Sequence, residues 1–218
     1  MLVGSLALLV GLGLGGCSPS DNFTTQYFET ENPSLLSQWG VLKVTGGAIT
    51  LRRDAAVYEL ASPLFSDYAG KLRTLSLPEG KGVRLDHQTG RFVYPVGTVI
   101  TKSFYYRRVE GSLRSDYRLI RTAGTFDLDA EHLDLDQITL LETRILVKRS
   151  SGWAALPYVW NDAQSDATLS PTGALVRAKL EHGGDREAFA YVVPNKNQCA
   201  GCHTLDQSSK AMLPIGPH

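Results

Sequence analysis

The chain has 218 residues with 22 basic and 22 acidic side chains, so it carries no formal net charge. This length fits one all-β domain, or one domain with a small second unit. Basic and acidic residues are mixed along the chain, which argues against a nucleic-acid-binding surface. Its three cysteines are an odd number, so a simple disulfide framework is not expected.

An unbroken run of apolar or small residues occupies positions 2–16. It is shorter than the roughly 20 residues that cross a bilayer as a helix, but it has the length of the apolar part of a signal peptide. The run ends in Leu14-Gly15-Gly16-Cys17, which resembles the bacterial lipobox, where cleavage precedes a cysteine that becomes acylated. We therefore expect a signal peptide over 1–16, a lipid anchor on Cys17, and a flexible polar tether over 17–32.

Two details of this segment affect the expected location. No Lys or Arg precedes Lys43, although signal peptides normally begin with basic residues, so a buried strand or helix at the start of the domain is the alternative. Pro19, rather than an acidic residue, lies two positions after Cys17. By resemblance to sorted lipoproteins, this favours the outer membrane over the inner one. We expect a bacterial cell-envelope protein that is anchored by lipid and faces the periplasm or the cell surface.

Residues 33–194 are predicted to form one β-rich domain. A short helix is expected between Asn32, as its cap, and Gly40, with Pro33 in its first turn. After it, alternating apolar and polar residues are typical of strands. Strands are expected over 41–51, 71–77, 92–106, 138–148, 153–160, 175–180 and 187–193.

The strand predicted over 138–148 shows the clearest alternation. Leu141 and every second residue as far as Val147 form one face. The charged residues Glu142, Arg144 and Lys148 lie on the other face. Gly and Pro recur about every ten residues and separate the predicted strands, which is typical of a sandwich or barrel.

The last predicted segment, 195–218, contains the motif that carries chemistry. The run Cys199-Ala200-Gly201-Cys202-His203 matches the haem-attachment pattern C-x-x-C-H. Two thiols at this spacing can form thioethers with the two vinyl groups of one haem, and the adjacent histidine is then placed to bind the iron. We therefore expect a covalent haem c on Cys199 and Cys202, with His203 as one axial ligand. Export agrees with this, because c-type haem is attached outside the cytoplasm.

Three other uses of the cysteine pair stay open. A zinc site would need two more ligands at matched spacing, and the sequence has no second cysteine pair. A thioredoxin-like redox pair normally lies at the start of a helix in a βαβ unit, whereas this pair follows a predicted β hairpin. A structural disulfide is the third alternative.

The second axial ligand has one candidate close to the motif. Met212 lies nine residues after His203, and that length of chain extends to about 30 Å, enough to pass around a porphyrin. Packing of Met212 against the haem is the alternative role. Further candidates are His87, His132, His182 and His218. Because the β domain precedes the motif, we expect the few apolar residues after His203 to supply much of the haem cover, which leaves the haem segment incomplete.

Two weaker patterns have structural alternatives. The acidic residues Asp127, Asp129, Asp134 and Asp136 fall in a predicted loop and could bind calcium. Their spacing matches no EF-hand, so a solvated loop is the alternative. The aromatic residues of 153–160 alternate along a strand, which indicates either core packing or a sugar-binding platform.

Several segments resemble a poorly characterised family of bacterial dihaem c-type cytochromes, many of which are lipoproteins. The segments are 62–68 (SPLFSDY), 94–98 (YPVGT), 141–146 (LETRIL), 156–161 (LPYVWN) and 193–199 (VPNKNQC). The family carries a second C-x-x-C-H further along its chain. This sequence has one such motif before His218, so the resemblance implies an amino-terminal part of a longer protein.

The sequence thus predicts a mainly β chain: a sandwich- or barrel-like domain followed by a short, incomplete cytochrome c-like segment. The expected function is electron transfer by a membrane-anchored c-type cytochrome, with redox proteins as partners. A haem enzyme of the peroxidase or oxidase type, or a subunit of one, is the first alternative. A β-sandwich binding module that carries a haem segment is the second.

Overall fold

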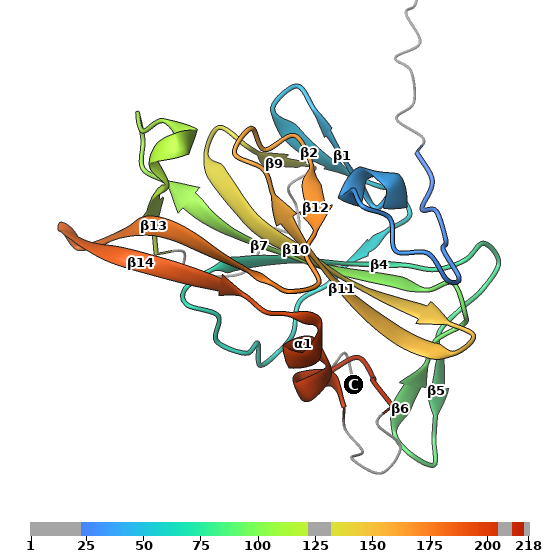
Figure 1. Cartoon of the computed structure of the whole chain (residues 1–218). Helices are drawn as coiled ribbons and strands as arrows, with labels where there is room; N and C mark the ends of the chain where they lie inside the picture. Colours follow the sequence, from blue (N-terminus) through green and yellow to red (C-terminus); the bar gives the residue numbers. More distant parts are fainter. Residues whose placement is uncertain (1–22, 122–131, 205–210, 216–218) are drawn as a thin grey trace, which may run out of the picture.

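The structure is a computed structural model that describes residues 23–121, 132–204 and 211–215. It is mainly β, as the sequence predicts (Figure 1). The strands are β1 (Leu42–Thr45), β2 (Ala48–Leu51), β3 (Ala56–Val57), β4 (Gly70–Ser76), β5 (Arg84–Asp86), β6 (Arg91–Val93), β7 (Val99–Arg108), β8 (Arg118–Ile120), β9 (His132–Asp134), β10 (Ile138–Arg149), β11 (Gly152–Trp160), β12 (Ala167–Leu169), β13 (Ala174–His182) and β14 (Asp185–Val193). The helices are the 3₁₀ turns η1 (Leu36–Trp39) and η2 (Arg114–Asp116) and the α-helix α1 (Lys196–His203).

Several predictions fall outside these ranges. They are the signal peptide over 1–16, the lipidated Cys17, and the candidate ligands Asp127, Asp129 and His218. In the described ranges, no helix is long and apolar enough to cross a bilayer.

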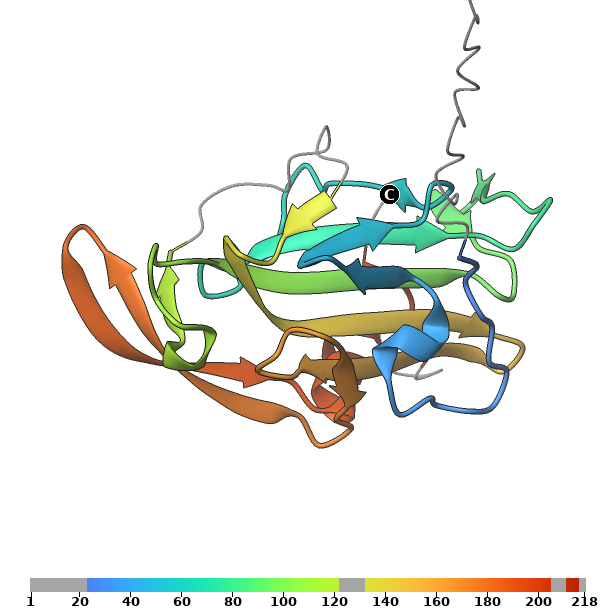
Figure 2. The same cartoon turned by 90° about the horizontal axis from the view of Figure 1, so that it is seen from above.

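A nine-stranded sheet forms the centre of the molecule. Its strands follow the order β12-β11-β10-β7-β8-β13-β14, and β4, which also pairs with β3, lies beside β7. The first part of β7 pairs with β4, and its last residues, Arg107 and Arg108, pair with β8. Every neighbouring pair is antiparallel except β8 and β13. Two strands, β4 and β8, therefore share one edge of β7. The long β13–β14 hairpin continues the sheet beyond β8, as Figure 2 shows.

One face of this sheet, which we call the covered face, packs under the small sheet β1-β2-β9 and η1 (Figure 1). Trp39 and Tyr158 are completely buried at its centre. The Trp39 indole N–H donates to the Tyr158 hydroxyl at 2.7 Å, and that hydroxyl donates to the Pro33 carbonyl at 2.8 Å. Each buried polar atom of this chain of contacts therefore has a partner.

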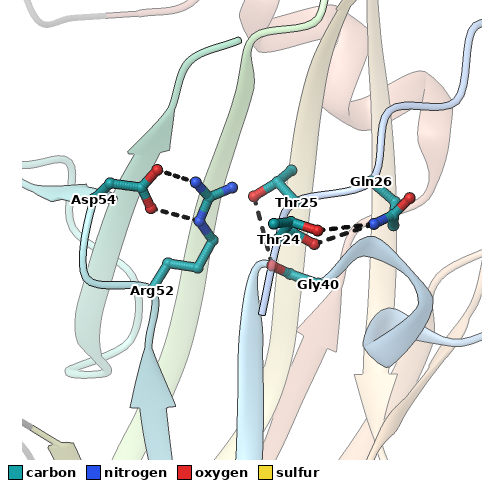
Figure 3. Close-up of polar contacts among 6 residues, drawn as sticks. All are labelled: Thr24, Thr25, Gln26, Gly40, Arg52 and Asp54. Carbon is teal, nitrogen blue, oxygen red and sulfur yellow. Dashed lines mark hydrogen bonds and ion pairs between the residues drawn. The ribbon is translucent and has the colours of Figure 1, made fainter. Parts of the chain in front are cut away.

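Residues 23–32, part of the predicted tether, lie against the domain. The Gln26 amide donates to the Trp39 carbonyl at 2.8 Å, and Thr25 contacts the carbonyl of Gly40 (Figure 3). Gly40 ends η1 with a φ of 57°, and a Cβ at this position would lie 2.1 Å from the Thr24 carbonyl oxygen. Arg149 donates to the carbonyl of Phe28 at 3.0 Å. In the described residues, this segment is therefore held by specific contacts. Figure 3 also shows the Arg52–Asp54 ion pair that follows β2.

The predicted hairpins over 138–160 and 175–193 are confirmed as β10–β11 and β13–β14. The segment 41–51 forms two strands, because Gly46 and Gly47 turn the chain with positive φ. The expected helix is shorter than predicted: it begins at Leu36 rather than near Asn32. The aromatic residues Trp153, Tyr158 and Trp160 are buried, which confirms their packing role over a sugar platform.

A β-bulge corrects the predicted faces of β10. Its pairing with β7 shifts between Leu140 and Glu142. Leu140 therefore packs on the covered face with Ile145, whereas Leu141 packs with Phe104 in a separate cluster. The predicted placement of Leu141 is wrong, because the extra residue of a bulge reverses the alternation.

Candidate functional site

The C-x-x-C-H motif lies on α1, which packs against β11 on the opposite side of the sheet from η1 (Figure 1). We call this side the cavity face. Asn195 caps the helix: its side chain accepts a hydrogen bond from the Gln198 amide, and its own amide donates to the Gln198 side chain, both at 2.9 Å. Gly173, with a φ of 76°, allows the close approach of the chain that leads into the helix, because a Cβ there would lie 2.4 Å from the Val193 carbonyl oxygen. The start of α1 is thus held by the Asn195 cap and by the close approach of the preceding chain to Gly173.

Both cysteines of the motif line one cavity. Their spacing of three residues places them on the same side of the helix. Cys199 is 7% exposed and packs with Ile100, Leu146 and Ala155, whereas Cys202 is exposed. Burial raises the pKa of the Cys199 thiol, an effect that the positive charge of Arg144 opposes. Both thiols are free.

His203 is held by the chain segment that follows the motif. Its Nδ1 lies 2.8 Å from the carbonyl oxygen of Leu213, and the Leu213 amide donates to the His203 carbonyl at 2.9 Å. A carbonyl oxygen can only accept, so Nδ1 carries the proton of this bond and Nε2 keeps its lone pair. Burial lowers the pKa of His203, and the charges of Lys102 and Arg144 lower it further, while the bond to Leu213 acts in the opposite direction. A neutral imidazole that is oriented through Nδ1 is the form in which histidine binds metals.

The cavity between α1 and the sheet has a volume of about 830 Å³, within the range of cofactor pockets. Its wall comes from three parts of the domain: strands β4, β7, β10 and β11, the loop between β3 and β4, and the end of β14. The expectation that the residues after His203 supply much of the haem cover stays a prediction, because residues 205–210 and 216–218 lie outside the described ranges. Of the described residues after His203, Pro214 and Ile215 contribute to its lining.

The sheet presents two different rows to this cavity. One row is apolar and is formed by Ile100, Leu146 and Ala155, which lie opposite one another on β7, β10 and β11. The other row is two residues further along the strands and consists of positively charged side chains. It contains Arg73 on β4, Lys102 on β7 and Arg144 on β10. The cavity thus has an apolar part next to Cys199 and a cationic part beside it.

Two carboxylates accompany the cationic row. Glu59 pairs with Arg73 at 2.9 Å. Glu142 is 0% exposed, pairs with Arg144, and accepts a 2.6 Å hydrogen bond from the Tyr191 hydroxyl. Burial and the adjacent Glu142 both raise the pKa of Tyr191 far above its usual range, so this hydroxyl keeps its proton and acts as a donor.

The cationic row was not expected from the sequence. Glu142 and Arg144 lie on the face opposite to Ile145, as predicted, but the sequence does not indicate that this face lines a cavity. A charged residue at every second position of a strand is the usual pattern of a solvated face, and only the position of α1 shows that a cavity lies there. The one available signal was that Lys102 also interrupts a run rich in apolar and aromatic residues on a neighbouring predicted strand.

Met212 lies beside the motif but outside the cavity lining. It pairs with Thr204 in a β-bridge and packs against the cluster that contains Cys199 and Trp153. Its described contacts correspond to apolar packing, and its role as sixth ligand stays a prediction. In the described part of the chain, His203 is the only His or Met side chain among those that line the cavity.

The described residues of the acidic cluster make local contacts. Asp134 accepts hydrogen bonds from the Asp136 amide and the Gln137 side chain, and Asp136 pairs with Arg114. Among the described residues, no group of three or more His, Cys, Asp or Glu side chains could hold a metal ion.

Comparisons with protein-family models, with curated proteins and with solved structures find no match to this chain. The site must therefore be interpreted from its own chemistry.

Proposed function

We propose that this chain is an extracytoplasmic c-type cytochrome that holds one haem covalently and transfers electrons. The observation that carries the proposal is the placement of Cys199, Cys202 and His203 on one cavity of about 830 Å³, with His203 oriented by Leu213. The residues present fit the group: two free thiols, a neutral imidazole with Nε2 available, and an apolar wall. A haem iron changes between its ferrous and ferric states and so carries one electron.

Each part of the site has a separate task in this function. Cys199 and Cys202 would form the two thioethers, and His203 would be the proximal ligand. The bond to Leu213 fixes the tautomer and the ring orientation of that histidine. The apolar row of Ile100, Leu146 and Ala155 excludes water from one wall, which lowers the local dielectric constant and thereby affects the reduction potential.

Covalent attachment is tested by expression with a cytochrome c maturation system, followed by extraction with acid acetone. The wild-type protein is expected to keep its haem. The double variant Cys199→Ala, Cys202→Ala should lose it, and Cys17→Ser should keep it as the matched cysteine control. Removal of all haem from the wild-type protein by the solvent would overturn the proposal.

Membrane anchoring through Cys17 is the second part of the proposal and rests on the lipobox-like run alone. The wild-type protein is expected in the membrane fraction and labelled by a fatty acid, whereas Cys17→Ser should be soluble or uncleaved. If the wild-type protein takes up no fatty acid, the anchor assignment fails, and the haem assignment is not affected.

A haem enzyme is the second candidate, and one observation favours it. In the described residues, the cavity lining contains no His or Met other than His203, which would leave one axial position open to a substrate. The optical spectrum separates the two candidates. A low-spin spectrum that carbon monoxide does not change supports electron transfer, and a high-spin spectrum with rapid carbon monoxide binding supports an enzyme.

A further inference from the structure

Three positively charged side chains form a row across the floor of the cavity. Lys102 on β7 lies directly between Arg73 on β4 and Arg144 on β10 in the strand register. Directly opposed residues in antiparallel strands have Cβ atoms about 5 Å apart, and like charges in such positions destabilise a sheet. All three side chains line the cavity. We call this set the cationic row.

The carboxylates at the site balance only two of these charges. Glu59 pairs with Arg73, and Glu142 pairs with Arg144. In the described ranges, Lys102 makes no ion pair. Its amine lies 4.8 Å from the centre of the Phe104 ring, and the guanidinium carbon of Arg144 lies 4.3 Å from the same centre. Asp67 also lines the cavity, but in the described ranges it makes no ion pair with the row, so Lys102 is the one charge of the row without an ion-pair partner.

Arg73 provides a second, independent observation. The residue is 2% exposed, and its Nε and Nη2 atoms are buried without a hydrogen-bond partner. Oε1 of its own partner Glu59 is also unsatisfied. A buried donor without a partner costs about 1–3 kcal/mol, so native proteins seldom leave such groups unfilled. Arg73 also lines the cavity, so its guanidinium combines donors that the described residues leave unfilled with a place beside the ligand.

The arrangement of the two rows indicates the shape of this ligand. The cationic row and the apolar row of Ile100, Leu146 and Ala155 are two residues apart along each strand, or roughly 7 Å. Cys199 packs with the apolar row. A matching ligand has an apolar body near the cysteine and carboxylates on another edge. Haem has this distribution, with vinyl groups at one side and two propionates at another.

We propose that Arg73, Lys102 and Arg144 form a carboxylate-binding row that holds the propionates of the haem and so fixes its orientation in the cavity. This inference rests on the proposed function. The two propionates would supply acceptors for the unsatisfied Arg73 donors and a counter-charge for Lys102. Charge-assisted hydrogen bonds of this kind are about twice as strong as neutral ones.

The test uses the full chain with Cys199→Ala and Cys202→Ala, so that binding is reversible. Haemin and haemin dimethyl ester, in which both propionates are blocked, are titrated against it by absorbance. Haemin is expected to bind about tenfold more tightly than the ester or better. Lys102→Met should remove most of this preference. Lys148→Met is the matched control. Lys148 lies on the same face of β10 as Arg144, but its amine is over Trp153 and it does not line the cavity. This variant should keep the preference for haemin over the ester.

The outcomes separate this inference from the proposed function. Suppose that the wild-type protein carries covalent haem but binds haemin and its ester equally well. This result would contradict propionate binding by the cationic row and would not affect the proposed cytochrome function. A wild-type protein that neither attaches nor binds haem would overturn both. A long-chain fatty acid has the same carboxylate chemistry and serves as the competitor. If it binds in place of haemin while the wild-type protein attaches no haem, the row serves a different carboxylate and the inference fails.

Discussion

The two faces of the central sheet are built from alternate residues of the same strands, yet they differ in how complete they are. On the covered face, Trp39, Tyr158 and Pro33 satisfy one another's polar atoms within a dry apolar core. On the cavity face, Arg73 keeps unsatisfied buried donors and Lys102 makes no ion pair in the described ranges. The polar centre of the covered face is thus satisfied within the protein, whereas that of the cavity face is not.

Along a single strand, residues that pack in the core alternate with residues that face the cavity. On β7, Thr101 faces the core and bonds to the Thr74 hydroxyl at 2.6 Å, whereas the adjacent Lys102 faces the cavity. Because side chains alternate, neighbouring residues can serve opposite purposes at no geometric cost. Substitutions on the two faces are therefore expected to differ in kind.

The largest effect is expected from Trp39→Ala on the covered face. Removal of a completely buried Trp leaves a cavity and should lower the free energy of unfolding by about 3–5 kcal/mol. Chemical denaturation measures this loss. Phe65→Ala is the matched aromatic control: Phe65 is 69% exposed at the cavity mouth and should change stability by no more than about 0.5 kcal/mol. Equal losses in the two variants would contradict the division between the faces.

The next largest effect is expected at the buried polar centre of the cavity face. Tyr191→Phe removes the hydroxyl that donates to Glu142 and should cost about 1.5–3 kcal/mol, because the acceptor is charged. Tyr106→Phe is the control in the same cluster, since its hydroxyl donates to the neutral Asp67 carbonyl, and it should cost about 0.5–1.5 kcal/mol. A larger loss in Tyr106→Phe would show that Glu142 does not depend on Tyr191.

The elements of the fold could be predicted from the sequence where the pattern is local. The β10–β11 and β13–β14 hairpins follow from alternation and from Gly183 and Gly184, which turn the second hairpin with positive φ. The bulge after Leu140 could not be predicted, because it depends on pairing with β7 and leaves no mark on the alternation. The division of 41–51 into two strands was available from Gly46-Gly47.

The candidate site was predictable only in its C-x-x-C-H motif. The spacing of Cys199, Cys202 and His203 names a chemistry by itself. The partner of His203, the Leu213 carbonyl, is a backbone atom and has no sequence signal. The cationic row joins Arg73 and Arg144 through Lys102, three residues far apart in the chain. Such a set exists only after the strands have paired, so no local pattern contains it.

A smaller effect is expected at the start of α1, the element that presents the motif to the cavity face. Asn195→Ala removes the side chain that accepts from the Gln198 amide and should cost about 1 kcal/mol. Asn197→Ala, at an exposed position inside the same helix, is the control and should be close to neutral. Thermal unfolding gives the loss, and the yield of covalent haem should fall in Asn195→Ala alone. Equal haem yields would show that the cap is not needed to position the cysteines.

The smallest effect is expected from the excess charge of the cavity face, because water still reaches the partly buried Lys102 and screens its charge. Burial, together with the positive charges of Arg144, Arg73 and Lys71, lowers the pKa of Lys102 to about 8, while Glu142 acts in the opposite direction. In the haem-free chain the unfolded state then binds more protons between about pH 8 and the ordinary lysine pKa of about 10.4.

Stability attributable to this residue must therefore rise with pH across that window, and the penalty is fully present below it. Lys102→Met should stabilise the haem-free protein at pH 7, and the gain should shrink as the pH approaches 10. Urea midpoints of the two proteins at both pH values test this, with Lys148→Met as the control that shows no such trend. A gain that is the same at pH 7 and pH 10 would mean that Met improves packing. The cavity face would then lack apolar contacts around residue 102, and the absence of an anion there would not explain the gain.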